Sequence, residues 1–96
     1  MHMFDIKMIT ENEVQIIGRF DASQTDTAKD VFNAVQKTTI VDFQDLDYIS
    51  SAGLGVLLMT QKRLKESNDE LILKNMNSHI REVFKYAGFD MIFRIE

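Results

Sequence analysis

Apolar and polar residues alternate in two short stretches at the start of the chain. On both sides of a polar turn at residues 10–12, every second residue is apolar: Phe4, Ile6, Met8, Val14 and Ile16. Successive side chains of a β-strand point to opposite faces of a sheet, so a period of two is typical of strands with one buried face. The pattern predicts an antiparallel hairpin.

After the hairpin the apolar positions change to the spacing of a helix. They recur at i, i+3, i+4 and i+7 in two stretches: Ala28, Val31, Phe32 and Val35, then Ile80, Val83, Phe84 and Ala87. The first stripe predicts an amphipathic helix that ends near Lys37. The second predicts a C-terminal helix that Asn77 or Ser78 caps and Gly88 ends. A further helix is expected over residues 51–67, with helically spaced positions at Leu54, Leu57, Leu58, Gln61 and Leu64.

Apolar runs between the helices predict the remaining strands, at residues 39–43, 71–73 and 91–95. The expected order is β-β-α-β-α-β-α-β, with no internal repeat. Helices between successive strands require parallel crossover connections after the hairpin. We therefore expect a small α/β fold, a mixed β-sheet with helices packed against it, formed as a single domain by residues 1–96.

Composition narrows the class of partner. The 96 residues include no cysteine, which excludes disulfides and thiolate metal ligands and fits a reducing compartment, so we expect a cytoplasmic protein. Fifteen acidic and eleven basic residues give a formal net charge of −4, which argues against binding to a nucleic-acid backbone. The longest apolar run, residues 56–59, is far too short to cross a bilayer. We expect a protein partner, no direct contact with nucleic acid and no membrane insertion.

Residues 47–58, Asp-Tyr-Ile-Ser-Ser-Ala-Gly-Leu-Gly-Val-Leu-Leu, contain the most informative pattern of the chain. A helix is expected to begin here, so Ser50 or Ser51 should occupy its N-cap. Gly53 and Gly55 each cost roughly 1 kcal/mol relative to alanine in a helix interior, so helix stability alone does not explain them. They either pack closely on the sheet or leave a serine hydroxyl accessible to a large partner, such as the active site of another enzyme.

Enzymatic and metal sites find little support in the sequence. The nucleophile elbow of hydrolases is Gly-x-Ser-x-Gly, whereas both glycines here follow the serines, and the two histidines are His2 and His79. A dinucleotide-binding fingerprint would need a third small residue where Leu58 stands. Three nearby carboxylates lack the spacing and the glycine of a calcium loop and are expected in a solvated loop: Asp42, Asp45 and Asp47. We expect no catalytic residue, no bound metal and no cofactor.

Residues 45–57 resemble the signature of STAS domains of the bacterial anti-sigma factor antagonist type, in which Asp-Ser-Ser/Thr-Gly-Leu-Gly carries a phosphorylated serine. The likeness extends over nearly the whole chain. Residues 18–21, Gly-Arg-Phe-Asp, resemble the family's Gly-Glu-Leu-Asp corner, residues 41–43 its central strand, and residues 80–89 its last helix and the turn after it. The chain departs from the family pattern at three positions, Arg19, Ser50 and Ala52, where the family has an acidic residue, an aspartate and a second Ser or Thr.

The resemblance implies a switch protein without catalytic activity. Aligned on the Gly-Leu-Gly motif, the family's phosphoacceptor is Ser51. The unphosphorylated form would bind an anti-sigma factor that is also a serine kinase and free a sigma factor; phosphorylation of Ser51 would end this binding, and a metal-dependent serine phosphatase would restore it. The phosphate would add a charge of about −1.5 to −2, which we expect near four carboxylates: Asp21, Asp42, Asp45 and Asp47.

The expected contact surface joins the Ser51 turn to an apolar face of the following helix. The core stripe of that helix takes three leucines, Leu57, Leu58 and Leu64, which leaves Leu54, Val56 and Met59 for a partner unless the helix is buried on two sides. The predicted partner-binding residues are Asp21, Ser50, Ser51, Ala52, Gly53, Leu54, Gly55, Val56 and Met59.

Two other functions stay open from the sequence. One is a scaffold or sensory subunit of a signalling assembly, or a STAS subunit of a lipid-transport complex, in either case without a phosphorylation cycle. The other is a small-ligand binding module that uses a pocket near Asp21, Asp42 and Ser51. Self-association would distinguish the first, and a thermal shift with nucleotides would distinguish the second.

Overall fold

The computed structural model describes residues 4–96 of the chain and contains one mixed sheet. Its strands are β1 (Asp5–Thr10), β2 (Glu13–Phe20), β3 (Thr39–Asp42), β4 (Leu46–Ile49), β5 (Leu71–Lys74) and β6 (Arg94–Ile95). They lie in the order β1-β2-β3-β5-β6, and β4 pairs with the end of β2 beyond β3. Only β1 and β2 are antiparallel among these pairs. The predicted hairpin and mixed α/β sheet are confirmed.

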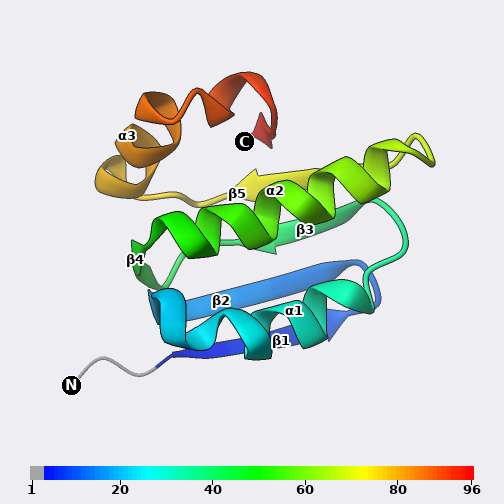
Figure 1. Ribbon diagram of the computed structural model, residues 1–96, viewed down its shortest axis with the longest axis horizontal. Helices are drawn as coiled ribbons and strands as arrows, with labels where there is room; N and C mark the ends of the chain where they lie inside the picture. The colour runs from blue at the N-terminus through cyan, green and yellow to red at the C-terminus, as the bar shows by residue number, and fades with distance from the viewer. Residues whose placement is uncertain (1–3) are drawn as a thin grey trace.

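Three helices accompany the sheet: α1 (Thr25–Asn33), α2 (Ser51–Lys65) and α3 (Ser78–Tyr86), with 3-10 turns at Ala22–Gln24 and Phe89–Met91. Helices α1 and α2 lie side by side on one face of the strands, and α3 lies near β5 and the C-terminus (Figure 1). Asn77, rather than Ser78, caps α3, because its Oδ1 accepts a hydrogen bond from the Ile80 N–H at 2.8 Å. Gly88 follows the helix with φ +75°, a conformation that favours glycine.

The core fills the space between the helices and the sheet. Every second residue of β2 is buried, as the period of two requires, and a cluster of aromatic rings joins β3, α3 and the C-terminal segment: Phe43, Phe84, Phe89 and Phe93. The one buried amide side chain of residues 4–96 is that of Gln61 on α2. It donates to the Ile92 carbonyl at 2.9 Å and accepts from the Leu71 N–H at 2.7 Å, so α2 is tied to β5 and to the C-terminal segment.

The sequence-based elements differ from the structure in four places. Residues 46–49 form the strand β4, although Asp47 was expected in a solvated loop, and the first helix ends at Asn33 rather than near Lys37. The last strand has only two residues, because residues 89–91 form a 3-10 turn. On β1, Met8 is 40% exposed although Ile6 on the same face is buried. Within residues 4–96, no helix is both long and apolar enough to span a membrane.

Candidate functional site

The two serines at the junction of β4 and α2 have different roles. Ser50 is the N-cap of α2: its Oγ accepts a hydrogen bond from the Gly53 N–H at 3.1 Å, and its own N–H donates to the Phe20 carbonyl at 2.9 Å. A serine cap stabilises a helix by roughly 0.5–2 kcal/mol relative to alanine. The capping position, which the sequence left open between two residues, is therefore Ser50.

Ser51 is the first residue of α2, and its side chain is exposed. Within residues 4–96 its hydroxyl makes no hydrogen bond, whereas the neighbouring serine is held by two. The next residue, Ala52, is also exposed and small. The hydroxyl of Ser51 is thus presented to solvent at the positive end of the α2 dipole, where the first-turn N–H groups face outward.

The two glycines of α2 answer different needs. A Cβ added at Gly53 would lie 2.9 Å from Cγ1 of Ile49 and 3.1 Å from the carbonyl oxygen of Phe20, closer than side chains normally approach. At Gly55 an added Cβ would meet no atom within 4 Å. Close packing on the sheet explains Gly53, and Gly55 instead leaves an open surface one turn after Ser51.

Asp21 lies beside this junction because Phe20 pairs with Ile49, so the residues that follow each strand leave the sheet together. Its Oδ1 accepts hydrogen bonds from the Ser23 hydroxyl at 2.6 Å and from the Ser23 N–H at 2.9 Å. These two bonds, with a smaller contribution from the Arg19 charge, hold the pKa of Asp21 below its ordinary value. Asp21 is therefore ionised at neutral pH and fixes the corner after β2.

Two of the other carboxylates expected near Ser51, Asp42 and Asp45, lie elsewhere. Asp42 pairs with Gln15, which precedes Phe20 by five residues, so it is about 17 Å from the end of β2. It accepts hydrogen bonds from the Gln44 N–H and the Asn75 amide, while Asp45 precedes β4 and contacts the Gln15 amide at 3.5 Å. The expected pocket of Asp21, Asp42 and Ser51 is thus wrong, and so is the expectation that Asp42 and Asp45 would flank a phosphate.

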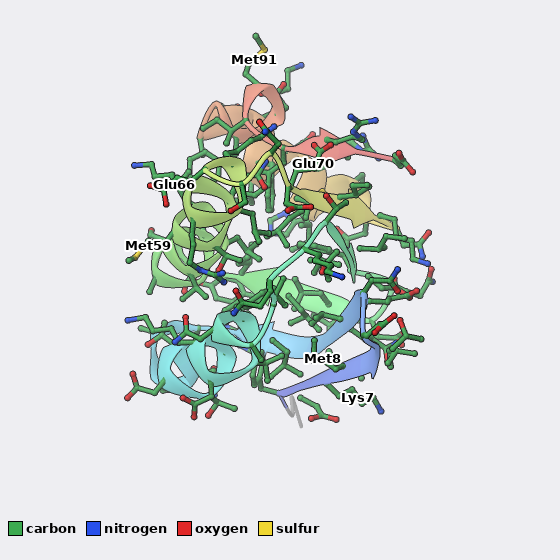
Figure 2. The ribbon with its side chains drawn as sticks, turned by 90° about the vertical axis from the view of Figure 1, so that its right-hand side faces the viewer. Lys7, Met8, Met59, Glu66, Glu70 and Met91 are labelled. Atoms are coloured by element: carbon green, nitrogen blue, oxygen red, sulfur yellow. The ribbon has the colours of Figure 1, made fainter. Side chains whose placement is uncertain are left out.

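The helix face predicted for a partner is only partly exposed. Leu54 and Val56 are buried, at 8% and 4% exposure, whereas Met59 is 67% exposed and points away from α2 (Figure 2). The expected exposure is wrong for these two residues, and the alternative that α2 is buried on two sides holds, with Val56 facing the neighbouring helix α1. The accessible surface of this end of α2 consists of the exposed Ser51 and Ala52, the half-buried Gly55 and, roughly 12 Å from Ser51 along the helix, the exposed Met59.

The described residues offer no arrangement typical of a hydrolase or a metal centre. His79 is exposed at the start of α3, and no hydrogen bond within residues 4–96 joins it to either serine; His2 lies outside the described residues. Among residues 4–96, no three His, Asp or Glu side chains are placed to hold a metal ion.

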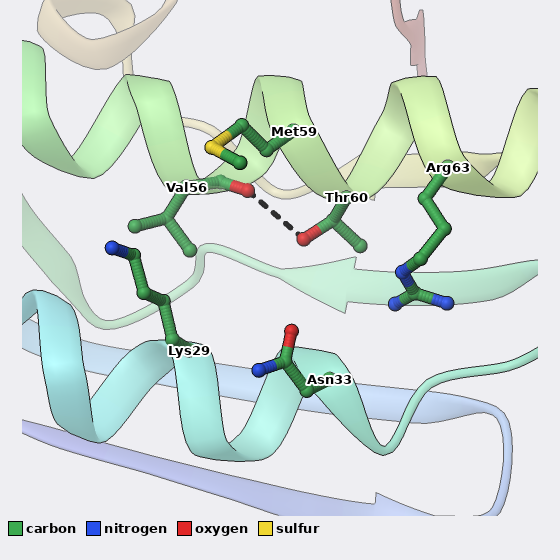
Figure 3. Close-up of a pocket in the computed structure, with 6 residues that line it drawn as sticks. All are labelled: Lys29, Asn33, Val56, Met59, Thr60 and Arg63. Atoms are coloured by element: carbon green, nitrogen blue, oxygen red, sulfur yellow. Dashed lines mark hydrogen bonds between the residues drawn. The ribbon is translucent and has the colours of Figure 1, made fainter.

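Two features of the site were not predicted. The guanidinium of Arg19 lies 4.1 Å from the ring centre of Tyr48, which ties β2 to β4 just before the Asp21 corner. Lys29 and Arg63 line a hollow between α1 and α2 (Figure 3). In the sequence Lys29 and Arg63 occupy ordinary polar positions of separate helices. Only the packing of the two helices shows that both residues line one hollow.

Comparisons with known proteins agree with this geometry. The family described as "Mlab, STAS domain" matches residues 9–94. BtrV of Bordetella bronchiseptica, whose name gives it as a candidate anti-sigma factor antagonist, is 43% identical over 60 residues, 62% of this chain and 52% of its own length. The chain thus spans about half of that relative. The anti-sigma-B factor antagonist of Listeria monocytogenes is 27% identical over 88 residues, 88% of this chain and 77% of the relative.

Solved structures show the same fold. The unphosphorylated form of the anti-sigma factor antagonist SpoIIAA matches with a TM-score of 0.77 and 24% identity, over 98% of this chain and 88% of SpoIIAA. The match confirms the expected fold class. Because the family match covers most of the chain and both the signature at the start of α2 and the fold agree with it, the chain belongs to the STAS domain family.

Proposed function

We propose that this protein is an anti-sigma factor antagonist that phosphorylation of Ser51 switches off. The unphosphorylated form binds an anti-sigma factor that is also a serine kinase, and a sigma factor is released for transcription. Phosphorylation by that kinase ends the interaction, and a serine phosphatase restores it. The STAS family and the names of the Bordetella and Listeria relatives support this assignment.

The observation that carries the proposal is that the two serines have different roles at the start of α2. Ser50 caps α2, so Ser51 is not needed for capping and its exposed hydroxyl is open to a kinase. A phosphate of about −1.5 to −2 charge is tolerated at a helix N-terminus, where the dipole and the first N–H groups favour anions. Loss of binding then comes from repulsion and desolvation at the interface rather than from refolding.

The proposed contact surface centres on Ser51 and keeps the residues inferred from the sequence: Asp21, Ser50, Ser51, Ala52, Gly53, Leu54, Gly55, Val56 and Met59. The exposed and half-buried members touch the partner directly. The buried ones, Gly53, Leu54 and Val56, act by setting the position of the turn and of α2 against the sheet. On this proposal the protein has no catalytic activity or cofactor of its own and works in the cytoplasm as a single STAS domain.

A phosphorylation assay tests the proposal. The assay uses a histidine-kinase-like ATPase protein that binds the chain, sought first among the products of the neighbouring genes. After incubation with this kinase and ATP, tandem mass spectrometry should find phosphate on Ser51. Phosphate on Ser50 would move the switch to the capping residue, and no modification by a kinase that does bind the chain would favour the scaffold function.

A further inference from the structure

A hollow of about 310 Å³ lies between α1 and α2. Lys29 and Asn33 line it from α1, and Val56, Met59, Thr60 and Arg63 line it from α2 (Figure 3). Val56 and Thr60 are buried and form its floor. The Thr60 hydroxyl donates a hydrogen bond to the Val56 carbonyl at 2.9 Å. Met59 is exposed above this floor.

The hollow is cationic. Lys29 projects from α1 toward Val56 and has no ion pair or hydrogen bond within residues 4–96. Arg63 donates one hydrogen bond, from Nη2 to the Phe32 carbonyl at 2.9 Å, which fixes its position and leaves other N–H groups of the guanidinium for a ligand. No carboxylate lines the hollow, and α2 contains no acidic residue. Helix α1 carries Asp26 and Asp30 outside the lining, and the whole chain has a formal net charge of −4.

We propose that the hollow receives an acidic segment of the anti-sigma factor, with a carboxylate facing Lys29 and an apolar side chain against Val56 and Met59. The inference rests on the proposed function and adds the chemistry of the partner. The cations of the hollow attract an acidic segment, while the negative charge of the rest of the chain repels it. An acidic partner is therefore directed to the hollow and away from other parts of the surface. The flexible thioether of Met59 suits an apolar contact of irregular shape.

The hollow and Ser51 lie on the same helix but on different sides of it. Val56 follows Ser51 by five residues, roughly 7.5 Å along the helix axis and about 140° around it. The direct distance from a phosphate on Ser51 to the hollow is therefore longer than this axial rise, which is itself close to the Debye length of about 8 Å at physiological ionic strength. A phosphate on Ser51 thus adds a screened repulsion of carboxylates in the hollow to its effect at the Ser51 turn.

Charge reversal at Lys29 tests the inference. Lys29→Glu should leave the fold intact, because the side chain is exposed and unpaired, and Lys85→Glu on α3 is a matched control with the same change in net charge. Calorimetry with the cognate anti-sigma factor, at low and at physiological ionic strength, measures both variants. We expect Lys29→Glu to weaken binding by about tenfold or more and to reduce its salt dependence, and Lys85→Glu to change the affinity by less than about twofold.

The other outcomes separate this inference from the proposed function. Equal weakening by both variants would mean that only net charge matters, and unchanged affinity of Lys29→Glu would mean that nothing acidic occupies the hollow; either result overturns the inference and leaves the antagonist function standing. A wild-type chain that does not bind the anti-sigma factor would overturn both. Met59→Ala provides a second variant, which should weaken binding without a change in salt dependence.

Discussion

Two glycines of α2 should respond oppositely to the same substitution. Alanine is preferred to glycine in a helix interior by about 1 kcal/mol. An added Cβ at Gly55 meets no atom within 4 Å, so Gly55→Ala should raise the free energy of unfolding by about 0.5–1 kcal/mol. For a domain of this size, such a gain corresponds to an increase in Tm of roughly 2–8 °C.

Gly53→Ala should instead destabilise the protein. The new Cβ would lie 2.9 Å from Ile49 Cγ1 and 3.1 Å from the Phe20 carbonyl oxygen. That oxygen is held by the Ser50 N–H at 2.9 Å, so the backbone cannot move aside without loss of this bond. Overpacking costs about 1–3 kcal/mol, and the helix gain of about 1 kcal/mol offsets part of it, which leaves a net loss of up to about 2 kcal/mol.

Urea unfolding of the two variants and the wild type provides the comparison, with Gly55→Ala as the matched control for helix propensity. Stabilisation by both substitutions would refute the packing explanation for Gly53. The same Gly55→Ala variant also tests the proposed interface, because the added methyl group lies on the surface one turn after Ser51. It should weaken partner binding while it raises stability, and unchanged affinity would remove Gly55 from the contact.

Four further predictions concern single side chains of the site. Ser50→Ala should lower the free energy of unfolding, measured with urea, by about 0.5–2 kcal/mol, because the helix cap is lost. In calorimetry, Ser51→Asp should weaken partner binding more than Ser51→Ala does, since only aspartate adds charge. Met59→Lys should keep its thermal melt and lose affinity, and Val56→Lys should melt early because a buried unpaired charge costs several kcal/mol. Because the pKa of Asp21 is lowered in the folded protein, the ionised carboxyl group stabilises the fold fully above the ordinary carboxyl pKa, and this stabilisation is lost as the pH falls through the lowered pKa. Asp21→Asn should therefore make acid unfolding less steep. An NMR titration of the carboxyl group measures the pKa directly.

Local sequence patterns correctly predicted the hairpin and the helix boundaries that depend on interactions between residues close in sequence. The period of two in the hairpin, the polar residues before α2 and α3, and the glycine after α3 all produce their effects through neighbours within a few residues. The strand β4 was missed because it follows Asp45, contains Asp47 and carries no clear alternation of apolar and polar residues. What makes it a strand is pairing with the distant end of β2, where Phe20 faces Ile49.

The orientation of α2 was not predictable for a related reason. Its residues 54 and 56–59 are all apolar, so the pattern indicates burial without a single direction. The position of α1 decides which side is covered: it buries Val56 and leaves Met59 exposed. The cationic hollow likewise depends on Lys29 and Arg63, which are far apart in sequence and line one hollow only because α1 and α2 pack together.

The central claim is that one modification at Ser51 controls binding of the anti-sigma factor. The most direct measurement is calorimetry of a single preparation of this chain, before and after kinase treatment, against the same anti-sigma factor, with mass spectrometry to verify the site. We predict that phosphorylation weakens the affinity by at least about tenfold, a free-energy change of about 1.4 kcal/mol, with no change in the circular dichroism spectrum. Equal affinity of the two forms, with phosphate verified on Ser51, would contradict the account.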